Sequence, residues 1–449
     1  MKSLNIFTLG CQMNVYDSQQ IRRLLSPLGY ENEADAENAD IIIVNTCSIR
    51  QKAADKAFSF LGRIKSMKKG GVPVLIGVGG CVAQQEGVEL LKRAPYIDFV
   101  FGTSAIHRLP EIVKRAENGE KIVDVGEFEE LIEPGTDASL PDNDAVSGFV
   151  SIMRGCDNFC TYCIVPFVRG RETSRPPEDI ITEIERRAAN GMTEVTLLGQ
   201  NVNSYGKKEN MSGFAELLHM VAEIDNVSRI RFATSHPKDL DDALIQCFAD
   251  IDKLCTHFHI PVQSGSNKVL KEMNRRYTRE HYMERISALR SVCPGIELST
   301  DIIVGFPGET DEDFADTVSM IQEIKYGSIF GFAYSDRPGT KASSYQNKIE
   351  TKLKKERLNY LLEVQNGITR SKNMACEGKE LTILVENCSV REKDGIKYTA
   401  LSGRSFGNRI VHVNESFSKY IELKALMGKE VRVKVEKALG HSLQGAFLS

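Results

Sequence analysis

The first quarter of the chain alternates short apolar runs with stretches of helical periodicity. The helical stretches include 17–28 and 48–67, and each repeats its apolar residues at intervals of three or four. The apolar runs have the composition of β-strands and cover 4–11, 41–47, 74–81 and 99–101. Strands that alternate with helices predict a doubly wound, parallel α/β sheet.

The same alternation resumes at residue 148 and gives six strand-helix units. Five helices are expected at 177–190, 213–224, 240–249, 280–292 and 311–325. The six strands are expected at 149–154, 194–198, 229–233, 257–261, 297–304 and 329–334. Six units predict a partial, TIM-like (β/α)6 barrel, whose reactive loops lie at the carboxyl ends of the strands.

The last part of the chain changes to a strand pattern of period two. Four strands, at 381–386, 397–402, 409–413 and 430–436, predict a small antiparallel β-barrel of OB type. We therefore expect a doubly wound domain at 2–118, an acidic linker at 119–141, a barrel domain at 142–372 and a terminal β-barrel at 373–440.

Composition narrows the class of protein. The 449 residues are 41% hydrophobic and carry a net charge of −4, which argues against a chain coated in nucleic acid. No apolar run approaches the length that spans a bilayer, so we expect a cytoplasmic protein without a membrane contact. Eleven cysteines in a chain of this size favour metal or redox chemistry over disulfides.

Cys156, Cys160 and Cys163 follow the first barrel strand with the spacing C-x3-C-x2-C. Three thiolates on one loop can each hold one iron of a cubane cluster, which leaves the fourth iron open to a substrate. The alternative is a structural zinc site, which needs four protein ligands. No histidine lies between His107 and His219 to supply the fourth, so the pattern favours the cluster.

Three further cysteines, Cys11, Cys47 and Cys81, each end an apolar run of the first domain. The carboxyl ends of parallel strands meet at one edge of the sheet, where ligands bind. Any one of these cysteines could be a small buried residue that closes a strand. Three at equivalent points favour a second iron-sulfur cluster.

Polar residues at the barrel strand ends are candidates for holding a cofactor, although the same residue types also build ordinary turns. Five arginines are candidates for phosphate contacts, with incidental ion pairs as the alternative. The cofactor candidates are Gln200, Asn201, Ser235, Gln263, Asp301 and Gly305, and the RNA candidates are Arg169, Arg171, Arg175, Arg404 and Arg409.

The motifs resemble those of the radical S-adenosylmethionine methylthiotransferases over essentially the full length, and the terminal barrel resembles a TRAM domain through Gly403-Arg-Ser405 and Asn408-Arg409. The likeness is greatest to members that modify tRNA. It rests on Gly10-Cys-Gln-Met-Asn14, Asn45-Thr-Cys-Ser-Ile-Arg50, Gly80-Cys-Val-Ala-Gln84, Arg154-Gly-Cys156, Ile164-Val-Pro-Phe-Val-Arg-Gly-Arg171 and Leu198-Gly-Gln-Asn-Val-Asn-Ser-Tyr205.

The resemblance implies two 4Fe-4S clusters and S-adenosylmethionine as cofactors. Cys156, Cys160 and Cys163 would hold the cluster that generates a 5′-deoxyadenosyl radical, and Cys11, Cys47 and Cys81 would hold the auxiliary cluster that carries the sulfur. The implied reaction is transfer of a methylthio group to C2 of N6-isopentenyladenosine at position 37 of tRNA. The implied partners are a tRNA anticodon stem-loop and a reducing electron donor, and the implied state is a monomer.

Two alternatives remain open. One is methylthiolation of threonylcarbamoyladenosine in tRNA or of a ribosomal protein, whose enzymes differ most from this chain around the first two cysteines. The other is an iron-sulfur redox sensor that binds RNA and catalyses nothing. The polar strand ends of the barrel favour catalysis, because a sensor has no need of a cofactor-sized mouth.

Overall fold

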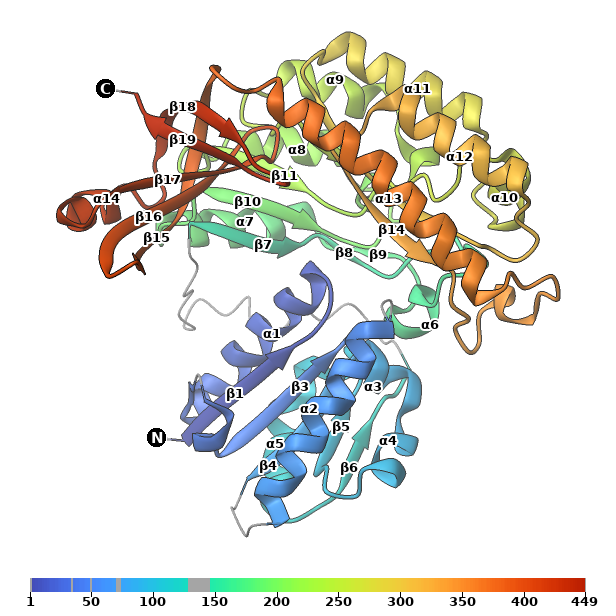
Figure 1. Cartoon of the computed structure of the whole chain (residues 1–449). Coiled ribbons are helices and arrows are strands. Elements are labelled where there is room, and N and C mark those ends of the chain that lie inside the picture. The colour runs from blue at the N-terminus through green and yellow to red at the C-terminus, as the bar shows by residue number, and fades with distance from the viewer. Residues whose placement is uncertain (1, 34, 49–50, 70–73, 128–145, 449) are drawn as a thin grey trace.

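The computed structural model describes residues 2–448 except for 34, 49–50, 70–73 and 128–145. The central barrel lies between two smaller domains. The N-terminal domain lies along one side of the barrel in Figure 1, and the terminal β-barrel lies at one end of it. No described helix is long and apolar enough to cross a bilayer.

The N-terminal domain is a six-stranded parallel sheet in the order β2-β1-β3-β4-β5-β6. Alternate residues of β3 face opposite sides of the sheet, so Ile41 and Ile43 enter one apolar cluster while Ile42 and Val44 enter the other. Both faces are therefore buried, which explains the uninterrupted apolar run. The strands are β1 Lys2–Thr8, β2 Tyr30–Asn32, β3 Ile41–Thr46, β4 Leu75–Gly80, β5 Phe99–Phe101 and β6 Ile122–Asp124; the helices are α1 Gln12–Leu25, α2 Gln51–Lys69, α3 Cys81–Glu86, α4 Val88–Arg93 and α5 Leu109–Glu117.

One part of the expected acidic linker is wrong. Strand β6 falls within 119–141 but pairs with β5 at the edge of the N-terminal sheet. Its three residues are too few to show a strand period in the sequence, and pairing with β5 fixes them instead. Residues 128–141 of the expected linker lie outside the described residues.

The central domain confirms the predicted partial barrel. Its six parallel strands form two sheets, β7-β10-β11 and β12-β13-β14, and a bridge between Ile230 and Leu254 adjoins β11 to the segment before β12. The strands are β7 Ser147–Ser151, β10 Glu194–Leu198, β11 Arg229–Phe232, β12 His257–His259, β13 Glu297–Val304 and β14 Ser328–Ala333; the helices between them are α7 Pro177–Ala189, α8 Phe214–Ala222, α9 Asp242–Asp250, α11 Arg279–Val292 and α12 Asp311–Ile324.

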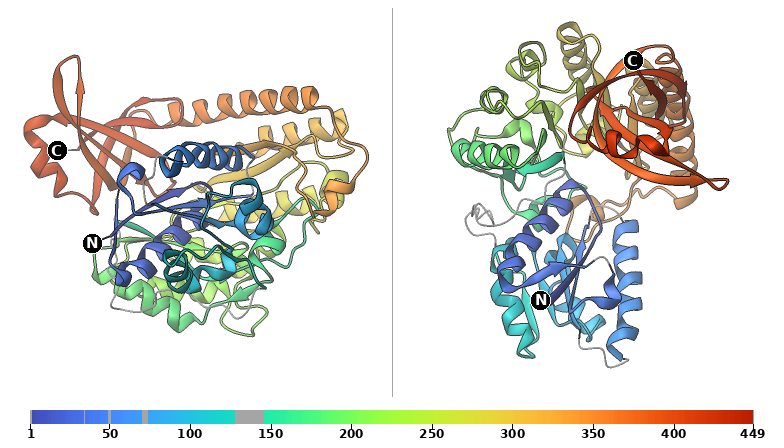
Figure 2. Two further views of the ribbon diagram at one scale, coloured as in Figure 1. Left: turned by 90° about the horizontal axis from the view of Figure 1, so that it is seen from below. Right: turned by 90° about the vertical axis from the view of Figure 1, so that its left-hand side faces the viewer.

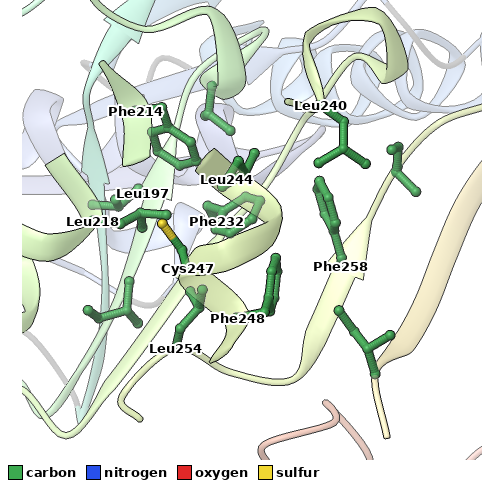
Figure 3. Close-up of a cluster of buried hydrophobic side chains, with 14 of the residues drawn as sticks. Leu197, Phe214, Leu218, Phe232, Leu240, Leu244, Cys247, Phe248, Leu254 and Phe258 are labelled. Carbon is green, nitrogen blue, oxygen red and sulfur yellow. The ribbon is translucent and has the colours of Figure 1, made fainter. Parts of the chain in front are cut away.

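The single strand expected at 149–154 is divided into β7 and a short second strand, β8 Met153–Arg154. Three short elements near the strand ends were not predicted: β9 Thr173–Ser174, α6 Val165–Arg169 and α10 Asn267–Glu272. The core between the strands and the outer helices is apolar and aromatic (Figure 3). Phe232 contacts Phe258 edge to face, with ring centroids 5.1 Å apart, a favourable arrangement of two aromatic rings. Cys247 lies in the same core, as expected for a structural cysteine.

Helix α13, Thr351–Met374, runs along β14 and leads to the terminal domain (Figure 1). That domain is a closed barrel in the order β15-β16-β17-β19-β18, with strands β15 Glu380–Lys393, β16 Ile396–Ser405, β17 Ile410–Ser416, β18 Glu430–Ala438 and β19 Leu443–Phe447, and one short helix, α14 Tyr420–Lys424.

Two details of the terminal domain correct the expectation. Strand β19 lies beyond residue 440, where the sequence pattern ended the domain, because its Gln444 and Gly445 weaken the strand signal. Strand β17 pairs with β19 in parallel, so the barrel is mixed rather than wholly antiparallel.

The terminal β-barrel docks at the amino-terminal ends of the central strands. The buried guanidinium of Arg229, the first residue of β11, lies 2.6 Å from the Glu430 carboxylate and 4.3 Å from the ring centre of Phe406. Arg409 pairs at 2.5 Å with Glu297, the first residue of β13. The terminal β-barrel and the carboxyl ends of the central strands therefore lie at opposite ends of the central domain. Figure 2 shows the terminal β-barrel at one end of the central domain.

Candidate iron-sulfur and cofactor sites

The loop of Cys156, Cys160 and Cys163 lies between β8 and α6, at the carboxyl ends of the central strands. Its entry is a tight turn at Gly155, where φ is +77° and a Cβ would lie 2.0 Å from the carbonyl oxygen of Arg171. Only glycine fits such a position without strain. The Cys163 amide donates to the Cys160 carbonyl at 2.9 Å, which folds the last two cysteines into one turn.

The segment after α10 holds this loop from the other side. The Thr161 amide donates to the Met273 carbonyl at 3.1 Å, and the Asn274 side-chain amide donates to the carbonyl of Phe159 at 3.1 Å. Phe159 has a φ of +47°, a conformation that a bulky residue adopts only where its surroundings impose it. The cysteine loop is therefore fixed by contacts from outside its own sequence.

The Arg275 guanidinium is buried beside the same loop. Its Nη1 donates to Cys160 Sγ at 3.5 Å, its Nη2 to the Pro261 carbonyl at 2.6 Å and its Nε to the Tyr277 hydroxyl at 2.9 Å. Burial raises the pKa of Cys156 to about 11 and also raises that of Cys163. Metal binding would have to remove these protons, because the thiolate is the ligand.

In the N-terminal domain, Cys11, Cys47 and Cys81 follow the neighbouring strands β1, β3 and β4. Cys11 precedes α1, and its Sγ lies 3.3 Å from the Oδ1 atom of the fully buried Asn14. The Asn14 amide donates to the Thr46 carbonyl at 3.0 Å, which ties the turn after β1 to the end of β3. The three thiols are thereby placed at one edge of the sheet.

These thiols differ in acidity from those of the barrel loop. A hydrogen bond with Cys47 lowers the pKa of Cys11 to about 6, against the opposing effect of burial, and the positive charge of Arg169 lowers it further. Burial raises the pKa of Cys81, while Arg169 opposes the rise. Arg169 is therefore an electrostatic neighbour of the N-terminal thiols, although it belongs to the barrel domain.

Helix α6 links the two cysteine sets. It starts two residues after Cys163, and its Val168, together with Ile164, packs against Cys81. The Thr103 hydroxyl donates to the Val168 carbonyl at 2.5 Å, and Arg169 pairs with Asp17 of α1 at 2.6 Å. Cys81 therefore lies next to the segment that follows the other cysteine set, and Figure 1 shows α6 beside the N-terminal domain.

Each cysteine triad offers three thiols, the number of protein ligands that leaves one iron of a cubane cluster open. Among the described residues, no three cysteine, histidine or acidic side chains are arranged to hold one metal ion. A cubane cluster makes a different demand, since each thiolate binds its own iron. The five remaining cysteines lie in the barrel domain or the terminal β-barrel, away from both sets, and are Cys247, Cys255, Cys293, Cys376 and Cys388.

Three buried polar atoms at the carboxyl ends of the barrel strands lack a hydrogen-bond partner among the described residues. Within the described part of the chain, Asn201 Oδ1, Ser235 Oγ and His236 Nε2 have no hydrogen bond, although each residue is at most 5% exposed. All three lie at the carboxyl ends of β10 and β11, and the Asn203 side chain joins the two loops through the His236 backbone. Unpaired buried polar atoms are costly, which makes these three residues candidates for contact with a bound polar group.

The other cofactor candidates have different surroundings. Gln200 Oε1 accepts from the Gly155 amide at 2.5 Å and thus supports the cysteine loop. Gln263 is buried with a φ of +72°, and its amide donates to the Asp301 carbonyl at 2.9 Å. Asp301 lies within β13, 3.6 Å from His259. Gly305 follows β13 with a φ of +70°, and a Cβ there would lie 2.2 Å from Cγ of Lys354.

The five arginine candidates for RNA contact separate into buried and exposed groups. Arg169 is buried against Asp17, and Arg175 is buried against Glu183 at 2.8 Å, so neither guanidinium faces the surface. Arg409 is held between Glu297 and Asn373. Arg171, which lies over the Phe159 ring, and Arg404 keep exposed side chains.

Sequence reasoning missed two features of the sites. Arg275 and Asn274 have no metal-ligand spacing that could reveal their contact with the cysteine loop. The terminal β-barrel carries a groove of about 220 Å³, lined by Arg391, Tyr398 and His412 among others, which only closure of the barrel creates.

Three family models match consecutive parts of the chain. Residues 3–102 match a family described as uncharacterized protein family UPF0004, residues 150–321 match the radical SAM superfamily, and residues 375–448 match the TRAM domain. The matched segments carry the N-terminal cysteines, the barrel cysteines and the terminal β-barrel, respectively.

Solved structures share the fold. A radical S-adenosylmethionine methyltransferase, TsrM, from Kitasatospora setae, with cobalamin and a 4Fe-4S cluster bound, has a TM-score of 0.55 at 13% identity, over 76% of this chain and 74% of that one. The radical enzyme OxsB, described as cobalamin-dependent, has a TM-score of 0.51 at 13% identity, over 81% of this chain and 56% of that one.

Curated relatives match nearly end to end. A tRNA-2-methylthio-N(6)-dimethylallyladenosine synthase from Desulfosudis oleivorans is 49% identical, over 99% of this chain and 96% of the relative. A protein of the same name from Syntrophus aciditrophicus is 50% identical, over 100% and 95%. The resemblance read from the motifs is confirmed, and the chain belongs to the family of tRNA-2-methylthio-N(6)-dimethylallyladenosine synthases.

Proposed function

We propose that this chain transfers a methylthio group to C2 of N6-isopentenyladenosine at position 37, beside the anticodon of tRNA. The observation that carries the proposal is the placement of two cysteine triads on facing domains, joined by helix α6. A reaction that removes hydrogen from an aromatic carbon and adds sulfur needs a radical source and a sulfur carrier at one substrate. Two adjoining sites supply both.

Cys156, Cys160 and Cys163 hold the cluster at the barrel mouth, and Cys11, Cys47 and Cys81 hold the auxiliary cluster. When bound, these clusters and S-adenosylmethionine supply the radical and the methylthio group. The protein orients them and excludes water. Asn201, Ser235 and His236 are the groups that we assign to S-adenosylmethionine, since their buried polar atoms need partners. Gln200 acts indirectly, by fixing Gly155 at the start of the cysteine loop.

The tRNA spans the length of the central domain in this proposal. The terminal β-barrel lies at the amino-terminal ends of the central strands, and the cysteine sites lie at their carboxyl ends. Arg391, Tyr398 and His412 of the terminal groove offer one cation and two rings, which suit a phosphate backbone and stacked bases. Arg171 and Arg404 remain candidates for further phosphate contacts.

The protein acts as a monomer, because one chain carries both cysteine triads and the terminal β-barrel. Its electrons come from an external donor. We place it in the cytoplasm, where its tRNA substrate is found.

A comparison of substrates tests the assignment. Reconstituted protein is incubated without oxygen with reductant, S-adenosylmethionine and tRNA carrying either isopentenyladenosine or threonylcarbamoyladenosine, and the nucleosides are analysed by mass spectrometry. We expect a mass gain of one methylthio group on the isopentenyl nucleoside alone. A mass gain only on the threonylcarbamoyl nucleoside would contradict the proposed substrate and assign threonylcarbamoyladenosine instead. Absence of any 5′-deoxyadenosine would favour the redox sensor.

A further inference from the structure

Arg275 forms no salt bridge within the described chain, in contrast to five other buried arginines. Arg275 is 4% exposed, and its guanidinium contacts a carbonyl, a phenol and the Cys160 thiol. Among the described residues, no acidic side chain forms a salt bridge with it. Five other buried arginines each pair with a carboxylate, namely Arg169, Arg175, Arg187, Arg229 and Arg357.

A buried cation without an anion is strongly unfavourable, so the fold must gain a negative charge at this point. The nearby polar groups do not provide one. Burial raises the pKa of Tyr277 to about 12, and burial lowers the pKa of His236, so both rings are neutral at physiological pH. Arg275 contacts the cysteine loop through Cys160. This loop becomes anionic once its three thiols have released their protons and bound a cluster.

We propose that Arg275 is a positioning residue for the radical cluster, and that its charge and its hydrogen bond to Cys160 Sγ make this cluster easier to reduce. Reduction is a one-electron step in which an electron enters the cluster from a chemical reductant and no bond forms or breaks. The cluster gains one negative charge, and a buried cation at its thiolate stabilises the more negative state. Hydrogen bonds to the sulfurs and local charge are known determinants of cluster potential.

The surrounding contacts fix the guanidinium in this role. The Pro261 carbonyl and the Tyr277 hydroxyl hold two of its nitrogen atoms, and Tyr277 is itself anchored to the Val262 carbonyl at 2.9 Å. The next residue, Arg276, is exposed and has a φ of +59°. The turn therefore directs one arginine inward and its neighbour outward, which provides a matched control of the same residue type.

The test is the reduction potential of the cluster in the full-length chain, with Cys11, Cys47 and Cys81 replaced by alanine so that a single cluster is measured. Dithionite titrations followed by EPR spectroscopy compare Arg275→Gln, Arg275→Lys and Arg276→Gln. We expect Arg275→Gln to lower the equilibrium constant for reduction of the cluster at least tenfold. For one electron this equals a reduction potential more negative by about 59 mV. Arg275→Lys should give a smaller shift in the same direction, and Arg276→Gln should give none.

A purely structural role would reduce the iron content without moving the potential of the cluster that remains. An unchanged potential in loaded Arg275→Gln protein would overturn the proposal. If Arg275→Gln protein binds no iron, the Arg275→Lys variant decides, because lysine cannot make all three contacts of the guanidinium. A reduction potential of Arg275→Lys equal to that of the parent would overturn the proposal. The inference rests on the proposed function only in taking Cys160 as a cluster ligand. The measurement uses no RNA, so a wrong substrate assignment leaves it unaffected.

Discussion

Nη2 of Arg169 lies 2.6 Å from Oδ2 of Asp17, and both side chains are buried where the N-terminal domain meets the barrel. The pair joins α6, which follows the barrel cysteines, to α1, which follows Cys11. A single ion pair thus connects the segments that carry the two cysteine sets. Its burial makes it sensitive to the loss of either partner.

Replacing Arg169 with methionine should destabilise the domain junction by about 3–5 kcal/mol, because Asp17 would keep a buried charge without a partner. We expect a lower melting temperature by calorimetry and less iron bound at the N-terminal cysteines. The control is Arg171→Met, whose side chain is 66% exposed. A variant Arg169→Met that melts like the parent would show that the pair does not hold the junction.

The acidity of Cys11 predicts a pH dependence in the metal-free protein. A thiol with its pKa lowered to about 6 is mostly thiolate at neutral pH, whereas thiols with raised pKa values, such as Cys156, are protonated. Alkylation by iodoacetamide, followed by peptide mass spectrometry, should increase through pH 6 for Cys11 and only at far higher pH for Cys156. A Cys11 profile centred near the ordinary thiol value of about 8.5 would contradict the described contact with Cys47.

Ser235 should contribute directly to cofactor affinity. Its buried hydroxyl lacks a partner among the described residues, so Ser235→Ala removes a group that we assign to S-adenosylmethionine. We expect the Kd of S-adenosylmethionine to rise about tenfold, equivalent to about 1.4 kcal/mol, with unchanged iron content. Anaerobic calorimetry of cluster-loaded protein measures it. Ser291→Ala, on the exposed face of α11, should leave the Kd unchanged, and an equal Kd for both variants would remove Ser235 from the cofactor site.

Arg391→Gln should weaken tRNA binding without altering cleavage of S-adenosylmethionine. The groove that Arg391 lines lies in the terminal β-barrel, at the opposite end of the central domain from the cysteines. Loss of one phosphate contact should reduce the slope of log affinity against log salt by about 1. Filter binding at several salt concentrations tests this. Lys352→Gln, at an 86% exposed position of α13, is the matched surface control.

The fold was predictable wherever the apolar period was long and regular. β10 and β13 have the expected bounds, and the helices around the barrel lie within a few residues of their expected positions. The misses are short or depend on tertiary pairing. β6 and β19 have only three and five residues, and both are fixed by neighbouring strands rather than by their own sequences.

The cysteines were predictable as candidates because thiols at equivalent strand ends are an unusual pattern. The arginines were not, because charge along a sequence carries no information on burial. Arg169 and Arg171 are two residues apart, yet one is buried against Asp17 and the other lies exposed over a phenylalanine ring. Arg275 depends on a turn more than a hundred residues from the loop that it contacts.

The most direct test of the account is nucleoside mass spectrometry on isopentenyl-tRNA incubated anaerobically with reductant, S-adenosylmethionine and one of three proteins: the parent, Cys47→Ala or Cys160→Ala. We predict methylthiolated nucleoside with the parent alone, while 5′-deoxyadenosine still forms with Cys47→Ala and is absent with Cys160→Ala. Methylthiolation by either variant would contradict the claim that both cysteine triads serve one reaction.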